Sequence, residues 1–213
     1  MKEQEYRRIE EYMKACMTDA AHDREHVYRV LRAALKIADT EPEADRDILT
    51  AACLLHDIGR EKQYADPKVC HAEAGAEMAR RFLLELGWEE DRVSHVSACI
   101  FTHRFRKGRE PGSMEAKILF DADKLDVCGA IGIARTLQYQ GRVGEPLYWV
   151  DKEGNPLPGD PGEPDSFLKE YRKKLSKLYG RFYTPAAAEM AKGRRQIAEA
   201  FYQAVWREIH LTD

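Results

Sequence analysis

Four ionisable residues stand beside apolar, helix-patterned stretches of this sequence, where an isolated charge would be costly. They are His26 in REHVYRV, the adjacent pair His56 and Asp57 in LLHDIGR, and Asp123 in DADKLD. Such groups need partners or a metal ion when they are buried. Imidazole and carboxylate together form a mixed ligand set, which suits Mn²⁺, Fe²⁺, Co²⁺, Ni²⁺ or Zn²⁺ more than Ca²⁺. The sequence therefore predicts a site for a divalent transition metal, with Mg²⁺ as a further candidate.

Each of these residues also has an ordinary structural role open to it. His26 could join an ion-pair cluster with Glu25 and Arg29. The histidine–aspartate pair could end a helix, where an imidazole interacts favourably with the helix dipole. Asp123 could pair with the neighbouring Lys124. All four being structural at once would be a coincidence, so the metal hypothesis is preferred.

The elements that would position these residues are predicted to be helices. Apolar residues recur at helical spacing around 27–38, 48–55 and 75–86, and a final helix is predicted around 196–207. Asp23 is a suitable N-cap for the helix that carries His26. Because convincing period-two segments are missing, we predict an all-α, single-domain helical bundle over residues 1–213, with the core motifs at about 20–130 and C-terminal helices at about 166–210.

One segment departs from the helical pattern. Residues from about 140 to 165 contain five of the nine prolines, at positions 146, 156, 158, 161 and 164, together with five glycines. Proline removes a backbone donor and clashes inside a helix. We therefore predict a long irregular loop, which in a compact domain is usually either functional or mobile.

Composition excludes several classes of protein. Lys and Arg number 34 against 37 Asp and Glu, for a formal net charge of −3, so neither a broad nucleic-acid surface nor a membrane surface is expected. The apolar runs are too short to span a bilayer, and the charged N-terminal stretch lacks the apolar core of a secretory signal. The five cysteines are scattered, without a CxxC pair, which is typical of reduced thiols in a cytoplasmic protein.

The order of the motifs, a histidine, then the HD pair, then an aspartate, resembles that of the HD-domain metal-dependent phosphohydrolases. The resemblance extends through CHAEAGAEMA, IFTHRF and DADKLDVCGAIGIARTLQYQGRVGEPLY. These stretches are similar to a bacterial subgroup of predicted HD hydrolases that includes nucleotide pyrophosphatases. The resemblance covers about residues 20–150, and it implies the helical HD-domain fold.

The resemblance also implies roles for individual residues. His26, His56, Asp57 and Asp123 match the metal ligands of the family, with Asp121 as a competitor for the last place and otherwise a neighbour that orients a ligand or holds a water. Asp57 could also accept a proton or orient the nucleophile. Two further histidines, His71 and His103, match positions that bind a second metal in some HD families, or they contact phosphate; the alternative is that both are buried histidines satisfied by hydrogen bonds.

Cationic and aromatic residues supply candidates for substrate binding. Arg29, Arg60, Arg104 and Lys124 each lie within four residues of a proposed ligand, where they could clamp a phosphoryl group, with Lys124 counted among the catalytic candidates. Tyr139 and Tyr148 could stack on a base. The alternatives are solvated surface charges and aromatic side chains that only pack the loop.

The sequence thus leads to an enzyme hypothesis with named competitors. We expect a metal-dependent phosphohydrolase that acts on a small phosphorylated substrate, with a nucleoside triphosphate cleaved to the monophosphate and pyrophosphate as the leading candidate. A 5′-nucleotidase or phosphodiesterase on the same site, a non-catalytic nucleotide sensor, and a di-iron oxygenase on an HD-type fold are the alternatives. Base preference, metal number and oligomeric state are left open.

Overall fold

The computed structural model describes residues 1–17, 24–104, 106 and 108–212. Within them the chain forms ten α-helices and one short 3-10 helix, and the only β pairing is an isolated bridge between Val150 and Pro156. The predicted all-α class is therefore confirmed. By their internal contacts the residues group into two compact units, Met1–Asp123 and Lys124–Asp213.

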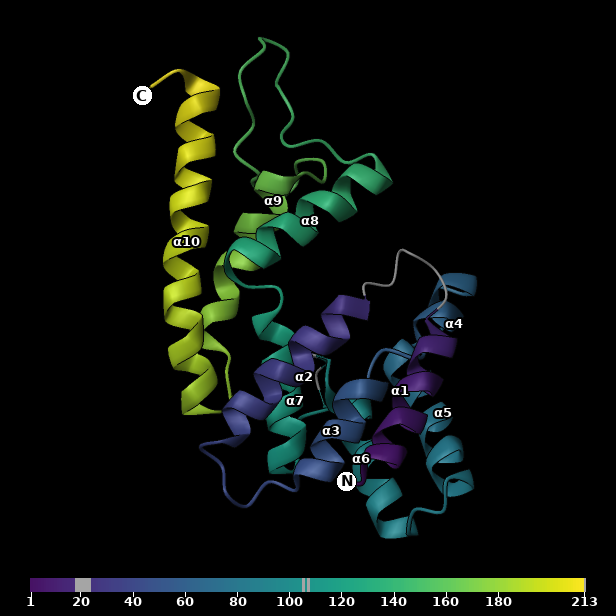
Figure 1. Ribbon diagram of the computed structural model, residues 1–213. Helices are drawn as coiled ribbons and strands as arrows, with labels where there is room; N and C mark the ends of the chain where they lie inside the picture. Colours follow the sequence, from purple (N-terminus) through teal and green to yellow (C-terminus); the bar gives the residue numbers. More distant parts are fainter. Residues whose placement is uncertain (18–23, 105, 107, 213) are drawn as a thin grey trace. The chain divides into compact units, whose positions relative to one another are not determined.

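The first unit contains six helices and most of a seventh (Figure 1). These helices and the turn after α3 carry every predicted metal ligand. Their bounds are α1 Glu3–Cys16, α2 Arg24–Ala38, α3 Arg46–Leu55, α4 Arg60–Ala65, α5 His71–Glu85, α6 Glu90–Thr102 and α7 Met114–Leu125. Helix α2 begins at Arg24; Asp23, its predicted N-cap, lies outside the described residues.

Helix α3 is the central element of this unit. Asp45 caps it by accepting hydrogen bonds from the backbone N–H groups of Asp47 and Ile48. Seven of its ten residues are buried, and it contacts α1, α2, α5 and α6. A helix that is apolar on nearly every side belongs in a core. The histidine–aspartate pair that follows α3 therefore emerges inside the unit and not at its surface.

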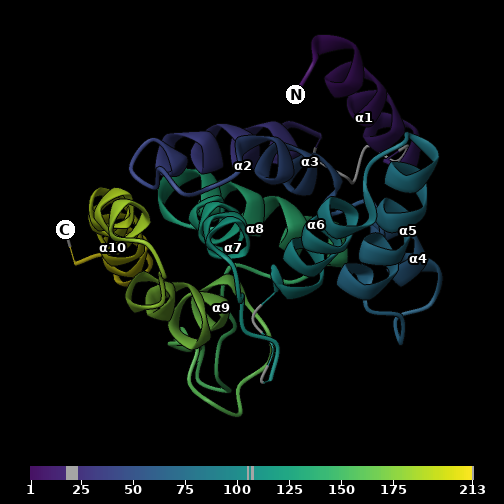
Figure 2. The same cartoon turned by 90° about the horizontal axis from the view of Figure 1, so that it is seen from below.

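Helices α5 and α6 lie side by side in both cartoon views (Figure 2). The turn after the histidine–aspartate pair touches the start of α5 so closely that only glycine fits. A Cβ at Gly59 would stand 2.2 Å from the backbone oxygen of His71 and 2.6 Å from the backbone nitrogen of Gly75. This contact sets the separation between the pair and α5.

The second unit contains α8 Gly129–Val143, α9 Phe167–Lys173, the 3-10 helix Leu175–Gly180 and α10 Pro185–His210. Its core is a cluster of buried residues on α8, α9, the 3-10 helix and α10: Ile133, Phe167, Leu168, Tyr171, Leu175 and Ala198. Helix α10 begins at Pro185, well before the predicted start, because Thr184 caps it and proline suits the first turn. Within the predicted helix at 196–207, the apolar residues Ile197 and Phe201 are exposed, whereas α10 packs through Ala198, Tyr202, Val205 and Trp206.

The predicted irregular loop is present, with a later start. Helix α8 continues to Val143 and ends at Gly144, whose φ of 76° is a left-handed C-cap conformation that suits glycine. Regular helix resumes only at Phe167. The prolines between these points prevent a helix, whereas Gln140 to Val143 contain none and extend α8.

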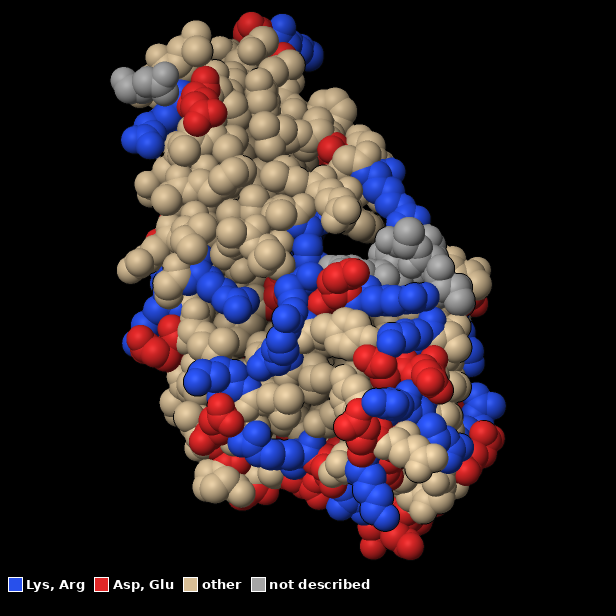
Figure 3. All heavy atoms as spheres, viewed as in Figure 1, with Lys and Arg blue, Asp and Glu red and all other residues tan. Residues whose placement is uncertain are grey.

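The surface agrees with the balanced composition. On the face shown in Figure 3, acidic and basic side chains are interspersed over the helices of the first unit. Among the described helices, none combines the length and the apolar character needed to cross a bilayer.

Candidate metal centre

Residues from three helices form a first cluster of three potential ligands. His26 lies on α2, His56 follows the last residue of α3, and Asp123 lies on α7. The Nε2 atom of His26 is 3.3 Å from that of His56 and 3.3 Å from Oδ1 of Asp123. One ligand atom of each falls within 4.8 Å of the others, a spacing that could hold one metal ion. We call these three residues the first half-site.

Asp57, His71 and His103 form a second cluster of the same kind, which we call the second half-site. Oδ1 of Asp57 is 3.4 Å from Nε2 of His71 and 3.7 Å from Nε2 of His103. The two imidazole Nε2 atoms are 3.3 Å apart. All three residues are buried.

The two half-sites share one carboxylate. Oδ2 of Asp57 faces the first half-site, at 3.6 Å from Nε2 of His26 and 3.7 Å from Nε2 of His56. Oδ1 faces the second. Asp57 thus stands between two groups of imidazoles, in a position suited to bridging two cations.

Backbone geometry orients two of the histidines. His56 and His103 are the C-cap residues of α3 and α6, and each Nδ1 donates a hydrogen bond to the carbonyl three residues earlier. The acceptors are Cys53 O at 2.7 Å and Ile100 O at 2.6 Å. Because a carbonyl can only accept, Nδ1 carries the hydrogen and the neutral ring presents a lone pair at Nε2.

His71, the first residue of α5, is oriented by a side chain. Its Nδ1 lies 2.6 Å from Oε1 of Gln63 on α4. An amide oxygen is also only an acceptor, so Nε2 of His71 carries a lone pair as well. Hydrogen bonds of this kind at the outer nitrogen fix ring orientation in metal-binding histidines.

The donor chemistry fits a cation. In the second half-site two Nε2 lone pairs face each other at 3.3 Å without a hydrogen between them. Burial lowers the pKa of His71 to about 2 and the pKa of His103 to about 4, so neither ring takes up a proton at neutral pH. Lone pairs that converge in this way are satisfied by a metal ion.

The carboxylates are anionic under the same conditions. Burial alone would raise the pKa of Asp57, but Arg60 and the surrounding imidazoles hold it well below its usual range. Burial would raise the pKa of Asp123 as well, but its hydrogen bond with His26 and the charges of the nearby imidazoles together outweigh burial and lower it. Imidazole nitrogen and carboxylate oxygen are ligands for first-row divalent metals. Of the two competing aspartates, Asp123 belongs to the first half-site, whereas Asp121 is fully buried and belongs to neither half-site.

The predicted cationic residues are placed differently from one another. Arg60 donates from Nε to Oδ1 of Asp57 at 3.0 Å. Arg104 follows His103 and approaches Sγ of Cys70 at 3.9 Å. Arg29 is half-buried one turn after His26 on α2, and Lys124 is buried in the last turn of α7. Arg60 is thus placed directly at the centre, and Arg104 beside its edge.

Both predicted stacking tyrosines lie in the second unit. Tyr139 is exposed on α8, and Tyr148 packs partly buried against the core of that unit. Their role in base stacking stays a prediction.

Sequence reasoning missed Gln63 and the surroundings of Cys70. Gln63 is eight residues from His71, and no motif marks it. Cys70 precedes His71, and its Sγ is approached by Arg109 as well as Arg104. The only sequence signal for this group was the basic run FTHRFRKGRE, which contains both arginines.

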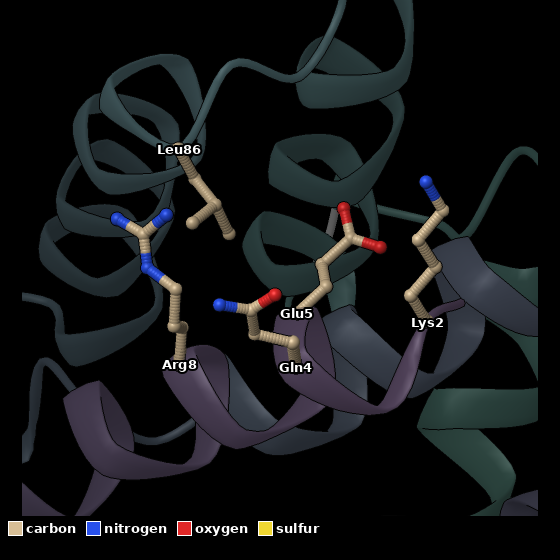
Figure 4. Close-up of a pocket in the computed structure, with 5 residues that line it drawn as sticks. All are labelled: Lys2, Gln4, Glu5, Arg8 and Leu86. Atoms are coloured by element: carbon tan, nitrogen blue, oxygen red, sulfur yellow. The ribbon is translucent and has the colours of Figure 1, made fainter.

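A surface pocket of about 310 Å³ lies elsewhere in the first unit (Figure 4). Side chains of the first turns of α1 and Leu86 after α5 line it: Lys2, Gln4, Glu5, Arg8 and Leu86. None of the predicted site residues borders it, so the chemistry is placed by the buried clusters and not by this pocket.

Comparison with known proteins agrees with the geometry. The HD domain family model matches residues 24–128, which include both half-sites. The protein YpgQ of Bacillus subtilis (strain 168) is 30% identical over 205 residues, covering 94% of this chain and 92% of YpgQ.

Solved structures match over almost the full length. An HD-superfamily hydrolase from Bacillus thuringiensis is 32% identical with a TM-score of 0.73, and the match covers 98% of each chain. The structure of Bacillus subtilis YpgQ in complex with ADP is 25% identical with a TM-score of 0.73, covering 96% of this chain and 95% of that one. With its converging histidines and aspartates, the chain belongs to the HD-domain superfamily of metal-dependent hydrolases.

Proposed function

We propose that this chain is a metal-dependent phosphohydrolase that acts on nucleotides, with hydrolysis of a nucleoside triphosphate to the monophosphate and pyrophosphate as the leading reaction. The observation that supports it most is Asp57, whose two oxygens face two separate groups of imidazoles. The nucleotide assignment is supported by the relative YpgQ, of which a complex with ADP has been solved.

In this proposal His26, His56, Asp57 and Asp123 hold a divalent cation, and His71 and His103 with Asp57 hold a second one. When bound, such a cation polarises a phosphoryl oxygen and lowers the pKa of water. The chain supplies the rest. In this proposal Asp57, which Arg60 and the surrounding imidazoles keep ionised, orients the ligands and the nucleophile.

Arginines at the centre and its edge are the candidates for binding phosphate. The Arg60 side chain is about one-third exposed, and its guanidinium can donate to a phosphoryl oxygen while Nε stays near Asp57. Arg104 lies at the edge, next to His103. Arg29, Lys124, Tyr139 and Tyr148 complete the proposed set for phosphate and base.

The test is a release assay over a panel of nucleotides with Mn²⁺, Co²⁺, Ni²⁺ or Mg²⁺, in which phosphate and pyrophosphate are measured separately. We expect pyrophosphate from triphosphates, and a loss of about 100-fold or more in His56→Ala and Asp57→Ala because each removes a ligand. His210→Gln, on the exposed end of α10, is the matched control and should keep full activity.

The other outcomes select the alternatives. Release of phosphate from monophosphates would replace the leading reaction with a 5′-nucleotidase, and cleavage of diesters would replace it with a phosphodiesterase. Nucleotide binding without release under any of these metals would contradict the enzyme. The paired half-sites also favour a di-iron centre as a second candidate, and oxygen consumption by the Fe²⁺-loaded protein would select it.

A further inference from the structure

Helix α4, Arg60–Ala65, connects to the second half-site in two opposing ways. It follows the turn after the histidine–aspartate pair and packs against α5 (Figure 2). From this single helix, Gln63 contacts the ligand His71, and Arg60 contacts the ligand Asp57. We propose that α4 sets the occupancy of the second half-site: Gln63 builds the half-site, and Arg60 competes with the cation for it.

Gln63 makes the contact that favours metal binding in the second half-site. His56 and His103 are oriented by backbone carbonyls of their own helices, which no substitution removes. His71 is the exception, because the acceptor for its Nδ1–H is a side chain from another helix. Without that acceptor the ring can rotate or shift its hydrogen to Nε2, and the lone pair that faces Asp57 and His103 is lost. Gln63 is therefore a positioning residue for the second half-site alone.

Arg60 is the opposing contact. Its Nε lies 3.0 Å from Oδ1 of Asp57, the same oxygen that faces His71 and His103. A metal bonded to that oxygen at about 2.1 Å would lie at most about 5 Å from Nε of Arg60. Two like charges at that distance, in a buried site, repel each other strongly. The guanidinium thus already neutralises the carboxylate that a second cation would need.

The charges of the whole centre agree with this competition. Asp57 and Asp123 contribute two negative charges, and the four imidazoles are neutral ligands. One divalent cation in the first half-site balances the carboxylates, and Arg60 then adds a positive charge. A second divalent cation is consequently disfavoured until Arg60 turns away from Oδ1. A phosphoryl group that attracts Arg60 would relieve the repulsion, which couples substrate binding to occupancy of the second half-site.

The experiment is a titration of the metal-free, full-length protein with Co²⁺, followed by d–d absorption and by equilibrium dialysis with elemental analysis. We expect two equivalents, of which the second binds more weakly. Arg60→Gln should tighten the binding of the second equivalent of Co²⁺ about tenfold, because the competing positive charge is gone. Arg60→Lys, which keeps a charge, should tighten it less.

Gln63→Leu should have the opposite effect and weaken the second equivalent about 10- to 100-fold, the usual cost of losing a contact behind a ligand. Gln63→Glu keeps an acceptor and should restore binding. Lys62→Gln removes an exposed charge from the same helix without touching the centre, and it should leave both equivalents unchanged. Affinity for the first equivalent reports intact folding in every variant.

The proposal is supported if Arg60→Gln raises the affinity for the second equivalent of Co²⁺ and Gln63→Leu lowers it. It is overturned if Arg60→Gln leaves the second equivalent unchanged or weaker, if Gln63→Leu does not weaken it, or if Lys62→Gln matches Arg60→Gln. The inference rests on the proposed metal centre, but its readout needs no turnover. A protein that shows these metal affinities but hydrolyses no nucleotide would contradict the proposed phosphohydrolase activity and would leave the inference about α4 intact.

Discussion

Four imidazoles meet two carboxylates in the first unit, and burial sets the protonation state of two of the imidazoles. His71 and His103 are almost fully buried, and burial favours the neutral ring. Each therefore offers a lone pair at neutral pH, while Asp57 and Asp123 remain ionised. The same arrangement that prepares the ligands also makes the fold sensitive to acid.

We expect the free energy of unfolding of the metal-free protein to fall as the pH is lowered from 7 towards 4. Free histidine titrates near pH 6.5, whereas the pKa of His103 in the folded chain is about 4. Between these values the unfolded chain binds the extra proton, so stability rises with pH, by about 1.4 kcal/mol per pH unit for each such proton. Urea denaturation at several pH values measures the slope.

His103→Gln should make the free energy of unfolding depend less steeply on pH, because the glutamine side chain does not titrate. His210→Gln, which removes an exposed imidazole, should leave the slope unchanged. An equal effect of both substitutions would show that burial of His103 does not cause the acid sensitivity.

At the scale of the elements, the centre depends on how closely the turn after the histidine–aspartate pair approaches α5. Gly59 has an ordinary φ of −82°, so its importance is the absence of a side chain and not backbone freedom. Its neighbours are backbone atoms of His71 and Gly75, which cannot move without shifting α5.

Gly59→Ala should therefore lower the free energy of unfolding by about 1–3 kcal/mol, the usual cost of overpacking a core. Gly141→Ala on α8 is the matched control, since nothing lies within 4 Å of its added Cβ. The control should be neutral or stabilising by up to about 1 kcal/mol, because alanine is the better helix former. Urea denaturation compares the two, and equal stabilities would refute the close-contact explanation.

At the scale of the whole molecule, the two compact units raise the question of whether they unfold together or separately. The prediction of one domain implies that both units unfold in a single transition. The three tryptophans allow a direct measurement, because Trp88 belongs to the first unit and Trp149 and Trp206 to the second. Variants that keep only Trp88 or only Trp206, with phenylalanine elsewhere, report each unit by fluorescence.

We expect the two single-tryptophan variants to show coincident transitions. Added Mn²⁺ at 100 times its dissociation constant should stabilise both by about 2.7 kcal/mol, because the ion binds only the folded state. A shift of the Trp88 transition alone, or two separate midpoints without metal, would show that the chain is two domains. His56→Ala should remove most of the response to metal.

How much of this could be read from the sequence depends on whether a feature is local. The helices containing residues 27–38 and 48–55 follow from their apolar spacing, because a helix repeats every 3.6 residues whatever packs against it. The irregular loop follows from its prolines. The last helix was predicted too short, because its N-cap, Thr184, lies well before the predicted range 196–207. Ile197 is exposed, since the burial of a side chain depends on which helix packs against it.

The sequence by itself determined the helical class and a set of imidazoles and carboxylates suited to a divalent metal, because residue types and short-range spacing carry that information. Only the tertiary structure decided that Asp57 faces both half-sites, that Gln63 orients His71, and that Gly59 must lack a side chain. These are contacts between helices. Their distances arise from packing through space, which the separation of residues along the chain does not encode.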